Sequence, residues 1–237
     1  MSIIAEIKHQ LGILTIEERE QIARWLEGYQ EEKVSLREVA EPAAIYAVEP
    51  PPYMTLEEYM EFEERSPARH EYVNGVVYPM SGPSTSHNRI VARLHIALAS
   101  RLRGGPCEAF ISNQKLKLTP DSDQFVYYPD LMVSCDPSGW HKKWLSNPRL
   151  VIEVLSPSTQ HIDRREKATT YKRIASIEEY VIVAQHSHQL TIRRRAENWV
   201  PDLVAGPEGV AELRSVGVSI PLAEVYEDVL APVFASA

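Results

Sequence analysis

The chain has 237 residues, of which 44% are hydrophobic and 24% charged, and its formal net charge at pH 7 is −8. This composition is typical of a globular protein with a sizeable core, and the negative charge argues against a protein that coats nucleic acid by bulk electrostatics. Cys107 and Cys135 show neither a metal-type spacing nor a disulfide framework, which favours a reducing cytoplasm. The sequence contains no apolar run of about 20 residues and no signal-peptide pattern at its start, so we expect no membrane span.

Three regions differ in composition along the chain. Residues 1–39 are predicted to form a helical extension, whose main helix begins at Thr15 and has an acidic first turn. Residues 40–52 are rich in proline, which is typical of an extended linker. We expect the main domain to cover residues 53–237.

The main domain is predicted to begin with a helix, a hairpin and a second helix. Thr55, with Glu58 three residues later, forms the pattern of a capping box. Asn74-Gly75 lies between two β-rich runs and predicts a hairpin turn. The second helix is expected over residues 84–104, with an apolar face made by Ile90, Leu94, Ala97 and Leu98.

Strands are predicted to dominate the rest of the domain. They are expected over residues 108–118, 125–135, 150–159, 179–185 and 190–195, with a helix over 163–176 and a short helix within 217–229. The run over 150–159 is almost continuously apolar, which is typical of a strand covered on both faces. This order of elements predicts an α/β or α+β fold with a central mixed sheet flanked by helices.

Two acidic residues interrupt predicted strands that are otherwise apolar. Asp130 follows Pro129, and Glu153 comes 23 positions later. If the strands are neighbours, the two carboxylates lie close together, and one takes up a proton unless a cation separates them. Mg²⁺ suits this arrangement, because it binds oxygen ligands and needs only one or two protein carboxylates. The alternative is that each acid forms a structural ion pair with a lysine or an arginine.

A lysine on the following helix is predicted to face the same place. Lys167, Tyr171 and Ile174 share one helical face, and the two larger residues should turn that face toward the sheet. Lys167 would then contact Glu153, or hold a water and a phosphate beside a metal ion. The alternative is a solvated pair between Asp163 and Lys167.

Several sequence blocks occur in an order that points to a known family. They are HEYVNG, STSHNRI, YPDLMV, LVIEVLSPST, the D…K…Y pattern of DRREKATTY, EYVIV and PLAEVYE. In this order they resemble the Uma-two family of bacterial proteins, within the PD-(D/E)xK nuclease superfamily of restriction-endonuclease-like fold. The resemblance covers about residues 53–229. It implies a curved sheet flanked by helices, with the active site at one end of the sheet.

The resemblance also implies which residues bind metal. Asp130 and Glu153 correspond to the Mg²⁺-binding pair, and the backbone carbonyl of Val154 is a further candidate ligand. The superfamily pattern ends in a lysine two positions after the acid, where this sequence has Leu155. Lys167 on the following helix is the candidate substitute.

Other residues are candidates for catalysis or substrate binding. Lys115 is the rival of Lys167, and Gln114 shares a face with Leu116 and Leu118 if this stretch is a strand. Glu71 and His87 match the family's upstream blocks. Glu71 is a candidate further carboxylate, with a cross-strand ion pair as the alternative. His87 is a candidate for phosphate binding or proton transfer, with helix capping as the alternative.

The negative net charge requires any nucleic-acid contact to be local. Basic clusters that could bind phosphates are Arg164, Arg165, Lys172 and Arg173; residues 141–143; and residues 193–195. For each cluster, the alternative is a solvated surface.

These observations predict a nuclease that uses Mg²⁺ or Mn²⁺ to hydrolyse phosphodiester bonds, with DNA as its substrate. Asp130, Glu153, Lys167, Glu71 and His87 are its predicted catalytic residues. Because nucleases of this fold often pair to cut both strands, we expect a homodimer. The alternative is a catalytically inactive binding module, linked to a toxin–antitoxin or mobile-element system.

Overall fold

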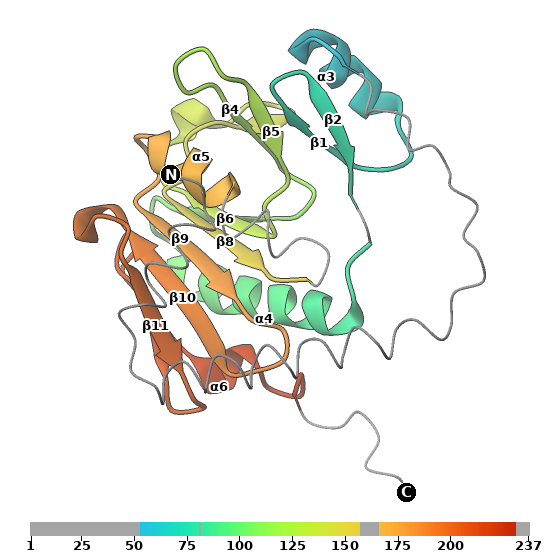
Figure 1. The fold of residues 1–237 in the computed structure, drawn as a ribbon. Helices are drawn as coiled ribbons and strands as arrows, with labels where there is room; N and C mark the ends of the chain where they lie inside the picture. The colour runs from blue at the N-terminus through green and yellow to red at the C-terminus, as the bar shows by residue number, and fades with distance from the viewer. Residues whose placement is uncertain (1–52, 81, 157–165, 231–237) are drawn as a thin grey trace, which may run out of the picture. The chain divides into compact units, whose positions relative to one another are not determined.

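A computed structural model of the chain describes residues 53–80, 82–156 and 166–230 (Figure 1). All of them belong to one compact unit, residues 51–237. The predicted helical extension and the linker lie outside the described residues, so the proposed domain boundaries stay predictions. Within the described residues, no helix is both long enough and apolar enough to cross a membrane.

The domain begins with a helix packed on a small sheet. Helix α3 (Leu56–Arg65) starts with the predicted capping box between Thr55 and Glu58. Strands β1 (His70–Val73) and β2 (Val76–Pro79) form the predicted hairpin, where Asn74 and Gly75 both have positive φ. With β4 (Lys115–Leu118), β5 (Phe125–Tyr127) and β7 (Trp144–Leu145) they form a five-stranded sheet of order β2-β1-β5-β4-β7.

The second sheet is larger and confirms the predicted central mixed sheet. Its order is β11-β10-β9-β8-β6-β3, in which the β8 and β9 strands are parallel and the other neighbours antiparallel. The strands are β3 (Glu108–Ile111), β6 (Leu131–Ser134), β8 (Leu150–Val154), β9 (Glu179–Val183), β10 (Gln189–Arg194) and β11 (Pro201–Ala205). Both faces of β8 are buried, as its apolar sequence predicts.

Each face of the six-stranded sheet packs against a different set of elements (Figure 1). One face meets helix α4 (Thr85–Leu102), helix α6 (Leu222–Val225) and the hairpin of β12 (Val210–Leu213) and β13 (Val218–Pro221). The other face meets helix α5 (Ala168–Arg173) and side chains of β4 and β5. The apolar stripe predicted for α4 is buried against the first face.

The structure corrects two of the predicted strands. The runs predicted over residues 108–118 and 125–135 each bend and enter both sheets, so β3 and β6 lie in the larger sheet and β4 and β5 in the smaller. In the second run the bend contains Pro129 and Asp130, where proline cannot donate a backbone hydrogen bond. The bend places Asp130 between the two sheets.

The structure also corrects the expectation for the cysteines. Cys107 and Cys135 form a disulfide. They flank paired positions of adjacent antiparallel strands, because Glu108 of β3 lies opposite Ser134 of β6. Strand register, which sequence spacing does not reveal, therefore brings the two thiols together.

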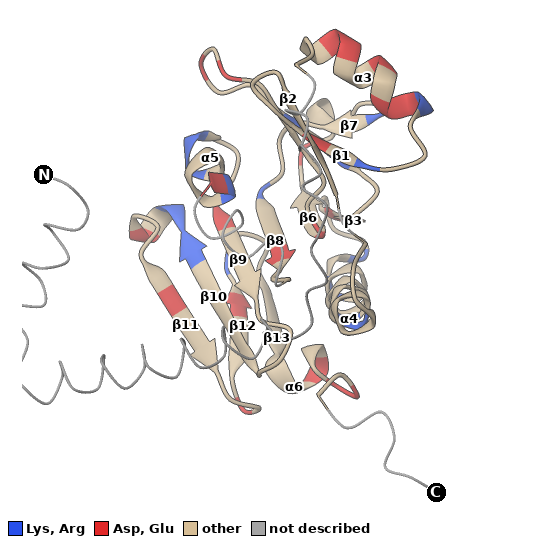
Figure 2. Cartoon of the chain, turned by 45° about the vertical axis from the view of Figure 1, so that its right-hand side comes forward, with Lys and Arg blue, Asp and Glu red and all other residues tan. Residues whose placement is uncertain are grey.

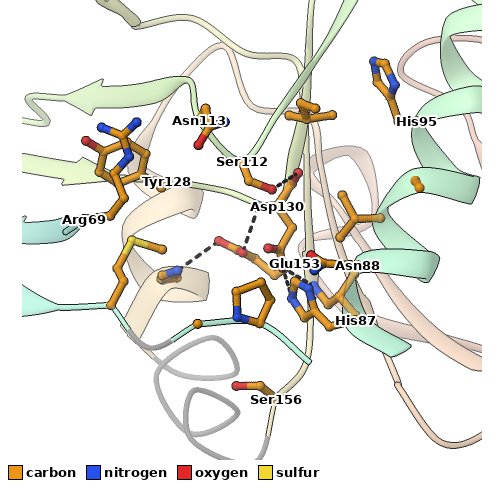
Figure 3. Close-up of a pocket in the computed structure, with 18 of the residues that line it drawn as sticks. Arg69, His87, Asn88, His95, Ser112, Asn113, Tyr128, Asp130, Glu153 and Ser156 are labelled. Atoms are coloured by element: carbon orange, nitrogen blue, oxygen red, sulfur yellow. Dashed lines mark hydrogen bonds and ion pairs between the residues drawn. The ribbon is translucent and has the colours of Figure 1, made fainter. Parts of the chain in front are cut away.

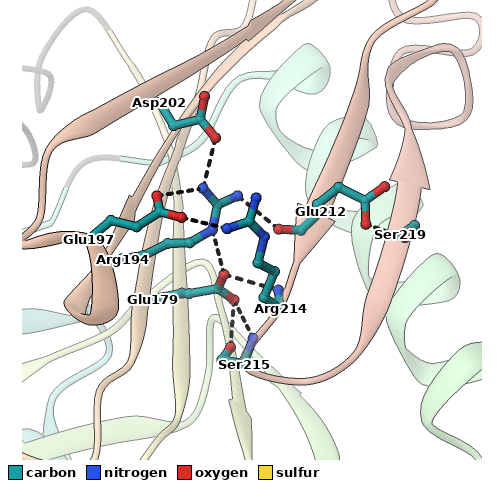
Figure 4. Close-up of polar contacts among 8 residues, drawn as sticks. All are labelled: Glu179, Arg194, Glu197, Asp202, Glu212, Arg214, Ser215 and Ser219. Atoms are coloured by element: carbon teal, nitrogen blue, oxygen red, sulfur yellow. Dashed lines mark hydrogen bonds and ion pairs between the residues drawn. The ribbon is translucent and has the colours of Figure 1, made fainter.

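A buried ionic network joins the strands at one end of the larger sheet (Figure 4). The Arg194 guanidinium donates to Glu179 at 3.0 Å, to Asp202 at 2.7 Å and to Glu197 at 3.1 Å. It also donates to the backbone carbonyl of Glu212 at 2.9 Å. Arg194 and Glu179 are 3% and 1% exposed, so each charge is compensated without solvent.

Candidate active site

Glu153 lies one residue before the end of β8 and is 3% exposed. Its Oε1 accepts hydrogen bonds from the Lys167 ammonium at 3.2 Å and the Tyr171 hydroxyl at 3.1 Å. Its Oε2 accepts from the backbone amide of Asp130 at 3.3 Å. Lys167 directly precedes α5 and Tyr171 lies in the helix four residues later, so one face of this segment supplies both donors, as the sequence predicts.

Asp130 occupies the bend between β5 and β6, beside Glu153 (Figure 3). Its Oδ2 accepts a hydrogen bond from the Val154 amide at 2.8 Å and contacts Nε2 of His87 at 3.1 Å. Ser112 holds the Asp130 carbonyl with its amide at 3.1 Å and its hydroxyl at 3.2 Å. The two acids are thus linked reciprocally: the Glu153 carboxylate accepts a hydrogen bond from the Asp130 amide, and the Asp130 carboxylate accepts one from the amide that follows Glu153.

Glu71 adds a third carboxylate through Lys167. The Lys167 ammonium lies 2.9 Å from Oε1 of Glu71, and the same oxygen accepts from the Tyr128 amide at 3.3 Å. The lysine therefore bridges Glu71 on β1 and Glu153 on β8. Among the described residues, Glu71, Asp130 and Glu153 bring three carboxylates close to the Lys167 ammonium.

His87 reaches Asp130 from the first turn of α4. Its amide donates to Ser84 at 3.1 Å, which makes Ser84 the cap of the helix. Its Nε2 donates to the Asp130 carboxylate, because an ionised carboxylate can only accept. The Ser84 hydroxyl in turn donates to Gln185 at 2.8 Å, and the Gln185 amide donates to the Leu155 carbonyl. This chain fastens the start of α4 to the end of β8.

Sequence reasoning missed Gln185 and a second positioning residue, Glu63. Glu63 is 1% exposed and accepts from the Tyr128 hydroxyl at 2.7 Å and from the His70 amide at 3.1 Å. It thereby holds the residues that adjoin Glu71 and the Pro129-Asp130 bend. The only signal in the sequence is an acid on the apolar face of α3, four residues after Tyr59.

Two tyrosines at the site stay neutral at physiological pH. Burial raises the pKa of the Tyr171 hydroxyl well above its usual range, and the Glu153 carboxylate raises it further. Burial also raises the pKa of the Tyr128 hydroxyl, and its hydrogen bond to Glu63 adds to the shift. Both hydroxyls therefore act as hydrogen-bond donors to carboxylates.

The acids open onto a pocket of about 810 Å³ (Figure 3). Arg69 and Tyr128 lie on one side of Asp130 and Glu153, and Asn88 and His95 of α4 lie on the other. His87, Val154 and Lys167 also line the pocket. The predicted catalytic residues, apart from Glu71, are therefore exposed to one shared space, and Glu71 contacts that space through Lys167.

Several predicted substrate-binding residues lie elsewhere. Lys115 does not line the pocket, and its ammonium is buried toward Glu63 and Glu64 of α3; burial lowers the pKa of this amine. Gln114 lies in the turn before β4 rather than in a strand, and it does not line the pocket. Lys172 is exposed on α5. Arg164 and Arg165 lie outside the described residues.

The other basic clusters mostly serve the fold. Lys143 pairs with Glu64 of α3, a helix along which acidic residues gather (Figure 2). Arg173 pairs with Asp121 and Asp123. In the cluster at residues 193–195, every arginine donates to a carbonyl or a carboxylate of the fold.

The donor set at the pocket fits a hard divalent cation. Asp130 and Glu153 line the pocket and supply carboxylate oxygens, the ligands that such a cation prefers. Among the described residues, no group of three or more His, Cys, Asp or Glu side chains is arranged as a metal site. A cation here would therefore keep several waters, which is how Mg²⁺ is usually bound.

Similarity to known proteins agrees with this fold. A model of the family Uma2, described as "Putative restriction endonuclease", matches residues 56–223. Two uncharacterized proteins of Synechocystis sp. are similar: slr1290 is 33% identical over 75% of this chain and 93% of its own length, and sll1609 is 29% identical over 58% and 78%. A crystal structure from Anabaena variabilis, described as a putative nuclease belonging to DUF820, shares the fold with a TM-score of 0.61 at 14% identity, covering 73% of this chain and 97% of that one. The chain therefore has a restriction-endonuclease-like α+β fold and belongs to the Uma2 family.

Proposed function

We propose that this protein is a Mg²⁺-dependent nuclease that hydrolyses phosphodiester bonds in DNA. The observation that carries the proposal is that Asp130, Glu153 and Lys167 line one pocket, with the Lys167 ammonium held between Glu153 and Glu71. Carboxylates that lie close together repel one another, and a divalent cation bound between them would relieve that repulsion. The family and the fold support a nuclease in general.

Asp130 and Glu153 would hold the ion, with the Val154 carbonyl as a further candidate ligand. When bound, Mg²⁺ lowers the pKa of a coordinated water and offsets charge on the phosphoryl group. The protein's own residues fix this arrangement in advance: His87 and the Val154 amide orient Asp130, and Tyr171 orients Glu153. Mn²⁺ suits the same oxygen ligands.

Lys167 takes the place of the lysine that the superfamily pattern has two residues after the acid, where this chain has Leu155. Its ammonium lines the pocket and is held at Glu153 and Glu71. There it can offset charge on the attacked phosphate and orient a water. Glu71 positions Lys167, and His87 positions Asp130 and can receive or donate a proton at Nε2 when that contact opens.

Cleavage assays test the proposal directly. The full chain should cut DNA in a panel of DNA and RNA substrates when Mg²⁺ or Mn²⁺ is present, and should stop when the metal is chelated. Asp130→Asn should abolish cleavage, because it removes one negative ligand while keeping the shape of the side chain. Asp228→Asn is the matched control, since Asp228 is 81% exposed and Asn tolerates its left-handed backbone. Cleavage that survives Asp130→Asn refutes the assignment.

A second candidate function is a non-catalytic binding module. It is favoured by Leu155 at the motif position of the lysine and by the protein donors that already engage Asp130 and Glu153. For this function, Mn²⁺ should not bind to the site in calorimetry. A homodimer, which gel filtration can detect, and a cytoplasmic location stay predictions.

A further inference from the structure

The pocket beside Asp130 and Glu153 is lined largely by apolar and uncharged polar side chains, which is unusual for a site that binds a DNA duplex. Eight large apolar side chains are exposed in the described part of the chain, and three of them line this pocket: Met80 at 38%, Ile96 at 62% and Ile111 at 43%. The lining also includes uncharged polar residues, among them Asn88, Ser112 and Asn113. A patch of this kind next to a reaction site is typical of ligand recognition.

In the part of the chain that the structure describes, few positive charges line the pocket. Its basic lining residues in the described ranges are Arg69, His87, His95 and Lys167. His87 and Lys167 are already engaged with carboxylates. Binding to duplex DNA depends on neutralising many phosphates, and a pocket of about 810 Å³ is of the size that holds one small molecule. The space suits a nucleotide rather than a length of duplex.

Arg69 is the lining residue best placed to bind a phosphate. Its guanidinium lies 5.5 Å from the centre of the Tyr128 ring, and no ion pair of Arg69 occurs within residues 53–80, 82–156 and 166–230. It lies across Asp130 and Glu153 from the α4 wall (Figure 3). A DNA strand could therefore place one phosphate at Arg69, the next phosphate at Asp130 and Glu153, and a base against α4.

We propose that this pocket binds an unpaired nucleotide of DNA, so that the enzyme acts on single-stranded or unpaired segments. The base contacts Ile96 and Ile111, the amide side chains of Asn88 and Asn113 lie within reach of its polar edge, and Arg69 binds the adjoining phosphate. Contacts of this type are sequence-tolerant, because every base offers an apolar face. This inference rests on the proposed function for the identity of the substrate.

A binding measurement tests the inference without relying on cleavage. Fluorescence anisotropy measures the affinity of the full chain for a fluorescein-labelled single strand and for the fully paired duplex of the same sequence. Ca²⁺ replaces Mg²⁺ in both measurements. The single strand should bind at least about fivefold more tightly than the duplex, since base contacts of this type are worth about fivefold or more. Ile96→Asp should remove most of this preference. Leu203→Asp is the matched control, because Leu203 is 60% exposed, carries no role at the pocket and receives the same charge.

Arg69→Gln tests the phosphate contact separately. It should weaken single-strand binding and make the salt dependence shallower by about one phosphate, whereas Arg65→Gln, on the exposed end of α3, should leave both unchanged. Equal or tighter duplex binding, or equal effects of Ile96→Asp and Leu203→Asp, would overturn the inference. Cleavage of duplex at the rate of single strands would also overturn it and leave the nuclease proposal standing. Selective single-strand binding with no cleavage of any substrate would support the binding inference and refute the nuclease proposal.

Discussion

The Asp130 amide donates to the Glu153 carboxylate at 3.3 Å, while the Val154 amide, next to Glu153, donates to the Asp130 carboxylate at 2.8 Å. This reciprocal pairing fixes both acids by backbone groups of adjacent antiparallel strands. A glutamate buried in an apolar strand needs polar partners, and Glu153 finds them in Lys167, Tyr171 and the neighbouring backbone. The arrangement is built before any ligand arrives, which is what an ion-binding or catalytic site requires.

Lys167 should be the most important single side chain for the stability of the site. It is 5% exposed, so Lys167→Met leaves Glu71 and Glu153 without their shared cation and should cost about 3 kcal/mol of unfolding free energy. Mg²⁺ should recover part of that loss, because it can supply the missing positive charge. Urea denaturation with and without Mg²⁺ measures both effects. Lys172→Met, on the exposed face of the same helix, should change neither; equal losses for the two variants would show that Lys167 compensates nothing.

Gln185 should position the site without touching a substrate. Gln185→Leu removes the link from Ser84 to the Leu155 carbonyl and should lower the unfolding free energy by about 1–2 kcal/mol. Because the start of α4 carries His87, cleavage should also slow, with kcat falling more than KM changes. Gln189→Leu is the matched control, since the hydrogen bonds of Gln189 are made by its backbone. If kcat is unchanged in Gln185→Leu, its role is purely structural.

Much of the framework could be predicted because its signals are local. The capping box of Thr55 and Glu58, the turn at Asn74-Gly75 and the buried stripe of α4 depend on residues a few positions apart. The approach of Lys167 to Glu153 was also predictable, since helical periodicity gives the face and the apolar residues give its direction.

Other features depend on contacts between distant residues. The bend at Pro129 sends one predicted strand into two sheets, and the sequence gives no measure of that angle. The Cys107–Cys135 pairing follows from the register of β3 on β6. Glu63 and Gln185 look like ordinary polar residues until Tyr128 and Ser84 are placed beside them.

The disulfide should contribute to stability under oxidising conditions. It closes a loop of 28 residues in sequence separation, which corresponds to as much as about 3–4 kcal/mol in the chain-entropy description. Thermal unfolding should therefore occur at lower temperature after reduction. The double variant Cys107→Ser/Cys135→Ser should unfold at the same temperature with and without reductant. If reductant leaves the unfolding temperature of the wild-type protein unchanged, the two cysteines are not paired in solution.

The ion pair between Arg101 of α4 and Glu224 of α6 should make stability depend on pH. Arg101 donates at 2.7 Å and 3.0 Å and lowers the pKa of the Glu224 carboxyl from its ordinary value of 4.5. A lowered folded-state pKa means that the contribution is present above the ordinary value and is lost as the pH falls through the folded value. The difference in unfolding free energy between wild type and Glu224→Gln should therefore shrink between about pH 6 and about pH 3. A difference that is constant over this range would exclude the pair as its source.

Titration of the full chain with Mn²⁺ by calorimetry tests most directly whether Asp130 and Glu153 share a divalent cation. Wild type and Asp228→Asn should each bind Mn²⁺, and Asp130→Asn should bind it much more weakly or not at all, because the substitution removes one of the two charged ligands. Absence of Mn²⁺ binding by the wild type, or equal affinity in Asp130→Asn, would contradict the account.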